Sequence, residues 1–97
     1  MKEIKILGVK YTVEEVECVS KEELRKGEVN FLTCRILIDK SMPKEMKEQV
    51  LMHEIMHAVF EMLGYDDLLT DECKVQGISA ALHQIFTDQD VFCSISE

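Results

Sequence analysis

The first 39 residues carry the alternation of apolar and polar side chains that is typical of β-strands. Residues 2 to 19 alternate charged and apolar positions and are rich in β-branched residues, and Gly8 interrupts them, so we predict a β-hairpin about this glycine. Residues 29 to 39 have a strongly apolar centre and predict a third strand. The charged segment between them, residues 20 to 28, predicts a loop or one short helical turn.

The pattern then changes to the period of an α-helix. Pro43 suits the first turn of a helix, where its missing N–H has no partner, and Gly64 suits the left-handed residue that follows the last turn. These two residues predict a helix over residues 43 to 63. From Val50 to Leu63 the side chains are almost all apolar, so we expect this helix to be buried on most of its circumference. The polar exceptions are His53, Glu54, His57 and Glu61.

A second helix is predicted from residue 70 to about residue 88, after a connector over residues 65 to 69. Thr70 can cap its N-terminus, and the acids that follow lie where the helix dipole favours negative charge. Within this helix, apolar or small residues recur at helical spacing at Val75, Ile78, Ser79, Leu82, Ile85 and Phe86.

After this helix, residues 90 to 97 suit either an extra edge strand or a docked extension.

These elements predict a single α+β domain over residues 1 to 97. It consists of a small antiparallel sheet of about three strands, packed on the buried helix and on a second, C-terminal helix. With 97 residues, 46% of them hydrophobic, the chain can form one core and has no room for a second domain.

Charge and cysteine content narrow the class of protein. A net charge of -8 argues against direct binding to nucleic acid or to an anionic membrane, since both require a basic surface. No apolar run approaches the roughly 18 residues of a membrane span, and the N-terminal residues do not form a signal sequence. The 4 cysteines include no CxxC pair, so we expect reduced thiols and a cytoplasmic protein.

The polar residues of the buried helix form an HExxH pattern. His53 and His57 are four residues apart, so both imidazoles lie on one helix face and can converge on one metal ion. Glu54 lies about 100° around the helix, where it can reach a water bound to that metal and act as a general base. Shuffling this composition produces the pattern roughly once in a hundred chains, so the motif alone is weak.

The buried setting strengthens the motif. Unpaired imidazole and carboxylate groups on a buried face cost on the order of 1 to 3 kcal/mol each, and a metal with its water would satisfy all of them. The alternative is structural: His53 and Glu54 would face solvent, and His57 would bond to a backbone carbonyl.

A catalytic zinc site also requires a third protein ligand. Glu72 is favoured because it continues the apolar stripe of the second helix and should therefore point at the first. The other acids suit other roles. Asp71 suits helix capping, and Asp66 and Asp67 suit a solvated turn. Glu61 lies on the same helix as the histidines and could reach their metal only with strain. The candidates are Glu61, Asp66, Asp67, Asp71 and Glu72.

Three further residues have a functional and a structural interpretation. His83 lies about 16 Å along a helix from Glu72, so it should be an exposed or core-edge histidine. Tyr65 could donate to a developing oxyanion, although packing at a helix end is more common. Cys73 is expected to be a buried, inert thiol.

The chain resembles the small zincin-type metallopeptidases of the ImmA/IrrE family, particularly the minimal forms encoded by phages or mobile elements. The resemblance is carried by a strand that ends in "ILID", a helix with "LMHEIMHAVFEMLGY" and a second helix that begins with acidic residues, "DECKVQGISAALHQIF". The resemblance covers roughly residues 29 to 87. It implies Zn²⁺ as cofactor, His53, His57 and Glu72 as ligands, and Glu54 as base.

The resemblance also implies an activity: hydrolysis of peptide bonds in a protein substrate, possibly a repressor-like regulator. We expect residues 35 to 39 to border the cleft and to pair with extended substrate. The competing hypotheses are a catalytically idle zinc-stabilised binding module and a metal-free interaction domain.

Overall fold

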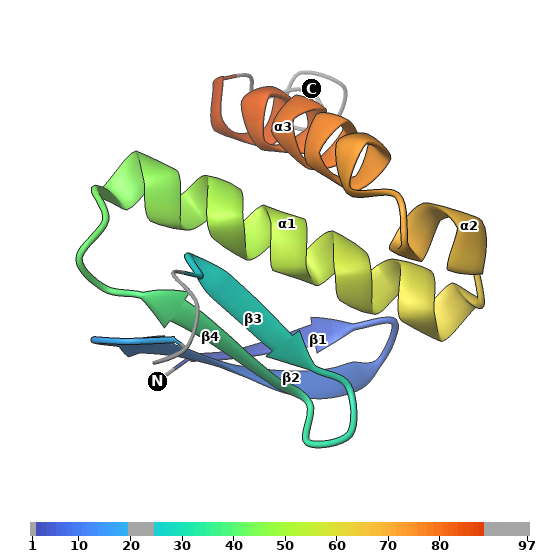
Figure 1. The fold of residues 1–97 in the computed structure, drawn as a ribbon, viewed down its shortest axis with the longest axis horizontal. Coiled ribbons are helices and arrows are strands. Elements are labelled where there is room, and N and C mark those ends of the chain that lie inside the picture. The colour runs from blue at the N-terminus through green and yellow to red at the C-terminus, as the bar shows by residue number, and fades with distance from the viewer. Residues whose placement is uncertain (1, 20–24, 89–97) are drawn as a thin grey trace, which may run out of the picture.

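The computed structural model describes residues 2–19 and 25–88, which form a sheet covered by helices (Figure 1). The predicted α+β class is confirmed at this level. In chain order the elements are β1 (Lys2–Ile6), β2 (Val9–Val16), β3 (Gly27–Asn30), β4 (Arg35–Asp39), α1 (Lys44–Leu63), α2 (Asp66–Leu69) and α3 (Glu72–Asp88).

The first two strands form the predicted hairpin. Ile6 pairs with Val9, which leaves Leu7 and Gly8 as a two-residue turn with φ of 49° and 85°. Two consecutive positive φ values are the signature of the type I′ turn, whose twist matches that of paired strands.

The single strand predicted over residues 29 to 39 is wrong, because this segment is a second hairpin. β3 and β4 pair antiparallel, and the side chain of Asn30 organises the turn between them. Its Oδ1 accepts hydrogen bonds from the N–H groups of Leu32 (2.9 Å) and Thr33 (3.1 Å). Cys34 closes the turn at φ 55°, a conformation that non-glycine residues seldom adopt.

The sheet has four strands in the order β1-β2-β4-β3, and β2 and β4 run parallel, so it is mixed where an antiparallel sheet of about three strands was predicted. The parallel pairing is possible because β3 intervenes between β2 and β4 in the chain. β4 is internal, and β3 is the edge strand beside it.

Helix α1 lies between the sheet and α3, so the molecule has three layers (Figure 1). Its bounds agree with the prediction: Pro43 precedes it, and Gly64 ends it at φ 74°. No residue from 50 to 60 is exposed, as the apolar pattern predicts. The sheet packs its inner face on α1 through Ile6, Tyr11, Val13, Ile36, Ile38 and Ala58.

The connector and the start of α3 differ in detail from the prediction. Residues 66 to 69 form the short helix α2, and Thr70 donates a hydrogen bond to the Asp66 carbonyl instead of capping α3. Asp71 caps α3, because its Oδ1 accepts from the N–H of Lys74 at 3.1 Å.

Helix α3 packs on α1 through its first half. Val75 and Ser79 are buried there, whereas Ile85 and Phe86 are exposed, so the predicted stripe faces the core only as far as about Leu82. None of the helices within residues 2–19 and 25–88 is both long enough and apolar enough to cross a membrane. The prediction for residues 90 to 97 lies outside the described residues.

Candidate metal centre

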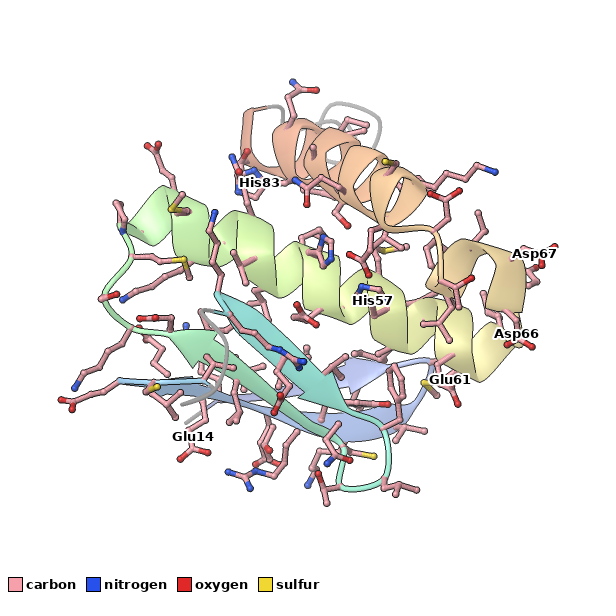
Figure 2. All side chains as sticks on the ribbon, in the orientation of Figure 1. Glu14, His57, Glu61, Asp66, Asp67 and His83 are labelled. Carbon is pink, nitrogen blue, oxygen red and sulfur yellow. The ribbon has the colours of Figure 1, made fainter. Side chains whose placement is uncertain are left out.

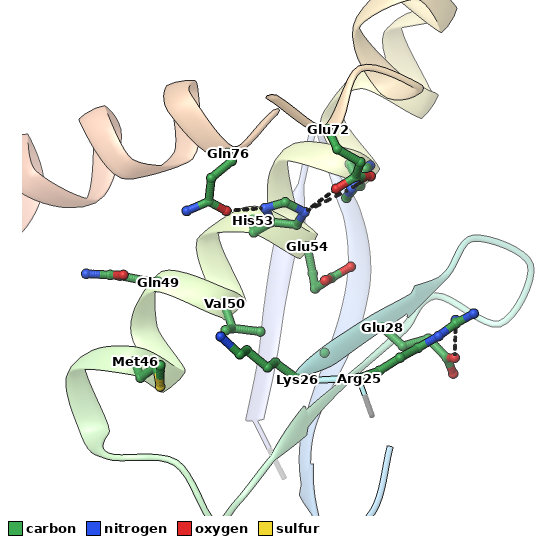
Figure 3. Close-up of a pocket in the computed structure, with 12 residues that line it drawn as sticks. Arg25, Lys26, Glu28, Met46, Gln49, Val50, His53, Glu54, Glu72 and Gln76 are labelled. Carbon is green, nitrogen blue, oxygen red and sulfur yellow. Dashed lines mark hydrogen bonds and ion pairs between the residues drawn. The ribbon is translucent and has the colours of Figure 1, made fainter. Parts of the chain in front are cut away.

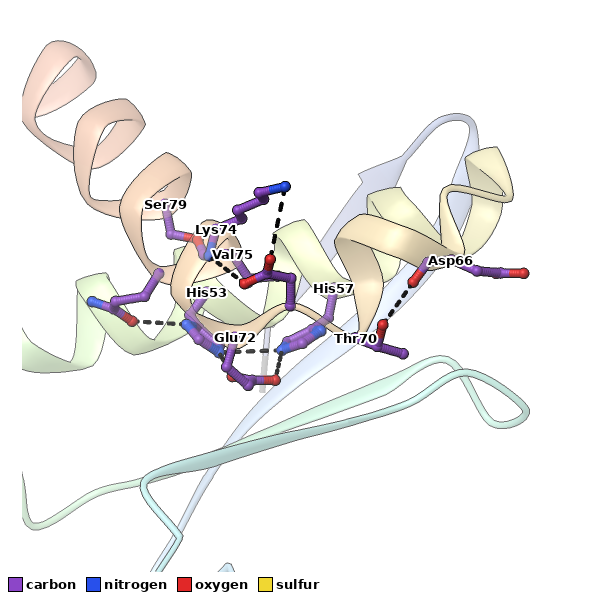
Figure 4. Close-up of polar contacts among 10 residues, drawn as sticks. His53, His57, Asp66, Thr70, Glu72, Lys74, Val75 and Ser79 are labelled. Atoms are coloured by element: carbon purple, nitrogen blue, oxygen red, sulfur yellow. Dashed lines mark hydrogen bonds and ion pairs between the residues drawn. The ribbon is translucent and has the colours of Figure 1, made fainter.

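Two histidines of α1 and one glutamate of α3 converge on one point (Figure 4). His53 and His57 are one helical turn apart, and their Nε2 atoms are 3.2 Å apart. Glu72, in the first turn of α3, places Oε2 3.1 Å from His53 Nε2 and Oε1 3.0 Å from His57 Nε2. The predicted pair and the favoured third residue are therefore brought together.

The other ring nitrogen of each histidine has its own partner. His53 Nδ1 lies 2.8 Å from the side-chain oxygen of Gln76, which can only accept a hydrogen bond. His57 forms a backbone hydrogen bond with Leu69, and Nδ1 is the nitrogen left for it because Nε2 faces His53 and Glu72. Each neutral ring then carries its proton on Nδ1 and its lone pair on Nε2.

This arrangement fits a zinc ion. Two imidazole lone pairs and a carboxylate all face one point, and such a set of acceptors repel each other unless a proton or a cation lies between them. Donor atoms around tetrahedral zinc are roughly 3.3 Å apart when each is roughly 2.0 to 2.1 Å from the metal. The two Nε2 atoms, 3.2 Å apart, match that spacing closely. Glu72 offers one carboxylate oxygen to each histidine, Oε2 at 3.1 Å from His53 Nε2 and Oε1 at 3.0 Å from His57 Nε2.

The side chains also have the burial and protonation that ligands require. Both histidines are largely covered, and Glu72 is 68% exposed, so the centre is open to solvent from the side of α3. Burial lowers the pKa of His57, although the carboxylate of Glu72 raises it in part. A neutral imidazole is the form that binds a metal.

Glu54 points away from this group of donors and into the space between α1 and β3 (Figure 3). Its side chain is nearly covered, at 8% exposure, so the alternative in which it faces solvent is wrong. Burial raises the pKa of Glu54 from 4.5 to about 7, with Glu72 adding to the rise and His53 opposing it.

The donors and Glu54 line one pocket, with a volume of about 530 Å³ (Figure 3). Its other wall is made by the edge strand β3 and the residues before it, from Arg25 to Glu28. The expectation that residues 35 to 39 border the cleft is wrong, because β3 lies between β4 and the pocket.

The remaining acidic candidates lie elsewhere. Glu61, Asp66 and Asp67 are exposed, and Figure 2 shows them toward the far end of α1 and on α2. Asp71 is engaged in capping α3. Within the described residues, the only group of metal-binding side chains close enough to share an ion is His53, His57 and Glu72.

The structure also shows the surroundings of His83, Tyr65 and Cys73, for which the sequence allowed either a functional or a structural role. His83 is a partly buried residue that contacts Glu48 across the two helices at 3.3 Å. Tyr65 is half-exposed at the start of α2 and does not line the pocket of the three donors. The expectation of a buried thiol at Cys73 is wrong, because this cysteine is exposed.

Two residues of the site were not predicted. Gln76 lies one turn after Glu72, and this i, i+4 spacing on a helix is the signal that could have identified it. Gly27 lets β3 approach α1 beside Glu54: an added Cβ would lie 2.5 Å from Val50 Cγ1 and 3.3 Å from Glu54 Oε2. No local pattern connects residue 27 to residue 54, since their proximity depends on how the sheet packs.

No protein-family model matches this chain, and no curated protein or solved structure matches it.

Proposed function

We propose that this chain is a zinc-dependent metallopeptidase, of the kind that its HExxH segment and following glutamate helix resemble. The observation that supports it best is the convergence of His53, His57 and Glu72 next to a buried carboxylate at Glu54. A metal site with a purely structural role has no use for that carboxylate, which is costly to bury.

His53, His57 and Glu72 would hold the ion through two nitrogens and a carboxylate. When bound, zinc supplies a Lewis acid that polarises a carbonyl group and makes water more acidic. Three protein ligands leave a further coordination position, which is the arrangement of catalytic zinc sites.

Glu54 would act as the general base and then as the acid. It would take a proton from the attacking water and pass it to the amine that leaves when the peptide bond breaks. A pKa of about 7 suits both steps near neutral pH, and a dication nearby would favour the carboxylate that starts the reaction.

The edge of β3 would hold the substrate main chain. The N–H of Asp39 donates to the Lys26 carbonyl at 2.9 Å, so by alternation the main-chain groups of Gly27 and Val29 point away from β4. Within the described residues no strand pairs with that side of β3. An extended peptide could add there as a further strand, beside Glu54 and the metal ligands.

A protein substrate, possibly a repressor-like regulator, is part of this proposal. The test is cleavage of a random decapeptide library and of candidate repressors by zinc-loaded protein. We expect wild type to cleave and Glu54→Gln to keep its zinc but lose more than about a hundredfold in rate. Equal rates for the two proteins would reject the assigned base.

The second candidate is a binding module in which zinc has no catalytic role. It is favoured by one observation: the donors lie on two helices, so a bound metal would cross-link α1 to α3. One zinc per chain without cleavage of any library peptide, by wild type or by Glu54→Gln, would favour this candidate over the peptidase.

A further inference from the structure

The pocket extends past the metal donors toward the first half of α1. Met46, Gln49 and Val50 precede His53 by seven, four and three residues, so they share its helix face and line the same pocket (Figure 3). Met46 and Val50 provide apolar walls, and Gln49 provides an amide. This recess is next to the proposed reaction centre, and none of the three donors belongs to it.

One positive charge borders the recess. Arg25 and Lys26 both line the pocket, but Arg25 extends to Glu28 and pairs with it at 3.3 Å. Figure 3 shows Lys26 extending the other way, toward Val50. Its ammonium group forms no ion pair with any residue that the structure describes.

The backbone of Lys26 is held in place while its side chain is exposed. Its carbonyl accepts the hydrogen bond from Asp39, which continues the β3–β4 ladder by one residue. A peptide that pairs with the outward groups of Gly27 would therefore pass next to Lys26. A substrate side chain directed at α1 from that point would meet the recess.

We propose that this recess selects a carboxylate on the substrate, with Lys26 as the specificity-determining residue. The inference rests on the proposed peptidase function and names its substrate class. The apolar walls suit the methylene groups of an acidic side chain, and the ammonium pairs with its charge. The carboxylate has two sources, an Asp or Glu side chain close to the cleaved bond or the free C-terminus of a peptide.

The net charge of the chain opposes this preference, so an effect of the pocket can be distinguished from an effect of the overall charge. The net charge of -8 repels acidic peptides as a whole. A preference for acidic residues at one position must therefore come from the pocket.

The test uses the zinc-loaded 97-residue chain and compares its cleavage sites in two random decapeptide libraries, one with amidated and one with free C-termini. We expect Asp and Glu to be enriched over Lys and Arg by about three- to fivefold at one position near the cleaved bond. Enrichment only in the free library, at the last residue, would assign the carboxylate to the C-terminus.

Lys26→Glu should reverse the preference to Lys and Arg, and Lys26→Ala should abolish it. The matched control is Lys5→Glu, which changes the net charge equally but lies on β1, at the opposite edge of the sheet from β3. Both glutamate variants should keep one zinc per chain.

The two failures are distinct. If wild type cleaves library peptides and Lys26→Glu leaves the residue preference unchanged, Lys26 does not determine specificity and the peptidase proposal stands. If zinc-loaded wild type cleaves neither library, the peptidase proposal fails and this inference fails with it.

Discussion

Helices α1 and α3 contact each other through histidine and glutamate side chains at two places, and only one of them has the features of a metal centre. At one end His53 and His57 meet Glu72, and toward the other end His83 meets Glu48 at 3.3 Å (Figure 2). The same residue types on the same pair of helices therefore produce two different environments.

Three differences separate them. The first cluster has three donors within reach of one another, whereas no such group includes His83 among the residues described. In the first cluster Gln76 and Leu69 also fix the ring nitrogens. Finally, within residues 2–19 and 25–88, only the first cluster has a buried carboxylate beside it, that of Glu54. Proximity of histidine and glutamate is thus insufficient, and a metal centre requires convergence and fixed lone pairs.

The largest contrast should be in zinc binding. His57→Ala removes one of three ligands and should weaken zinc binding by more than about a hundredfold, whereas His83→Ala should leave it unchanged. Competition with a chromogenic chelator measures both affinities. A comparable loss in the two variants would show that the two clusters do not differ in the way described.

The next effect concerns stability and pH. In metal-free protein Glu54 has a folded pKa of about 7 and an ordinary value of 4.5. The folded state thus binds its proton more tightly, and stability is lost as pH rises from 4.5 through 7, by about 3 kcal/mol in all. Glu54→Gln removes this loss, so it should exceed wild type in stability by up to about 3 kcal/mol at pH 8 and match it near pH 4.

Urea unfolding with a chelator present, at both pH values, measures this difference. Glu48→Gln is the matched control, because its carboxylate lies at the second cluster and is substantially exposed. If the difference in free energy of unfolding between Glu54→Gln and wild type is the same at pH 4 and pH 8, burial of the Glu54 charge has no cost and this prediction is wrong.

A smaller effect is expected from the side chain that orients His53. Gln76→Leu removes the acceptor of the Nδ1 proton and should lower zinc affinity by about ten- to a hundredfold. Gln84→Leu is the control, since Gln84 is exposed on the same helix near His83. Equal zinc affinities for Gln76→Leu and wild type would mean that the contact does not fix the ring.

The smallest effect should come from the second cluster itself. Glu48→Gln alters a partly exposed contact with His83 and should change the free energy of unfolding by less than about 1 kcal/mol. Thermal unfolding with zinc bound measures it. A loss of zinc from this variant would mean that the second cluster contributes to metal binding.

The sequence predicts the two long helices, α1 and α3, and their contribution to the site because local signals fix them, whereas it missed the short helix α2. Pro43 and Gly64 set the bounds of α1, and helical spacing places the two histidines together. Glu72 was favoured from the periodicity of α3, and it is the acid that the structure brings to them.

Features that depend on long-range packing were not predicted. The turn after β3 contains neither glycine nor proline, so nothing in the sequence marks it as a break in the apolar pattern. It is organised by hydrogen bonds to the Asn30 side chain and by the left-handed conformation of Cys34. The parallel pairing of β2 with β4 followed from that hairpin. The position of Gly27 against Glu54, and hence the wall of the pocket, depends on both.

We propose that His53, His57 and Glu72 together bind one zinc ion. A crystal structure of zinc-loaded protein, with anomalous data collected at the zinc absorption edge, tests it most directly. We predict one strong peak per chain, bonded to the Nε2 atoms of both histidines and to a carboxylate oxygen of Glu72. A peak bonded to other residues, or no peak after growth in excess zinc, would contradict it.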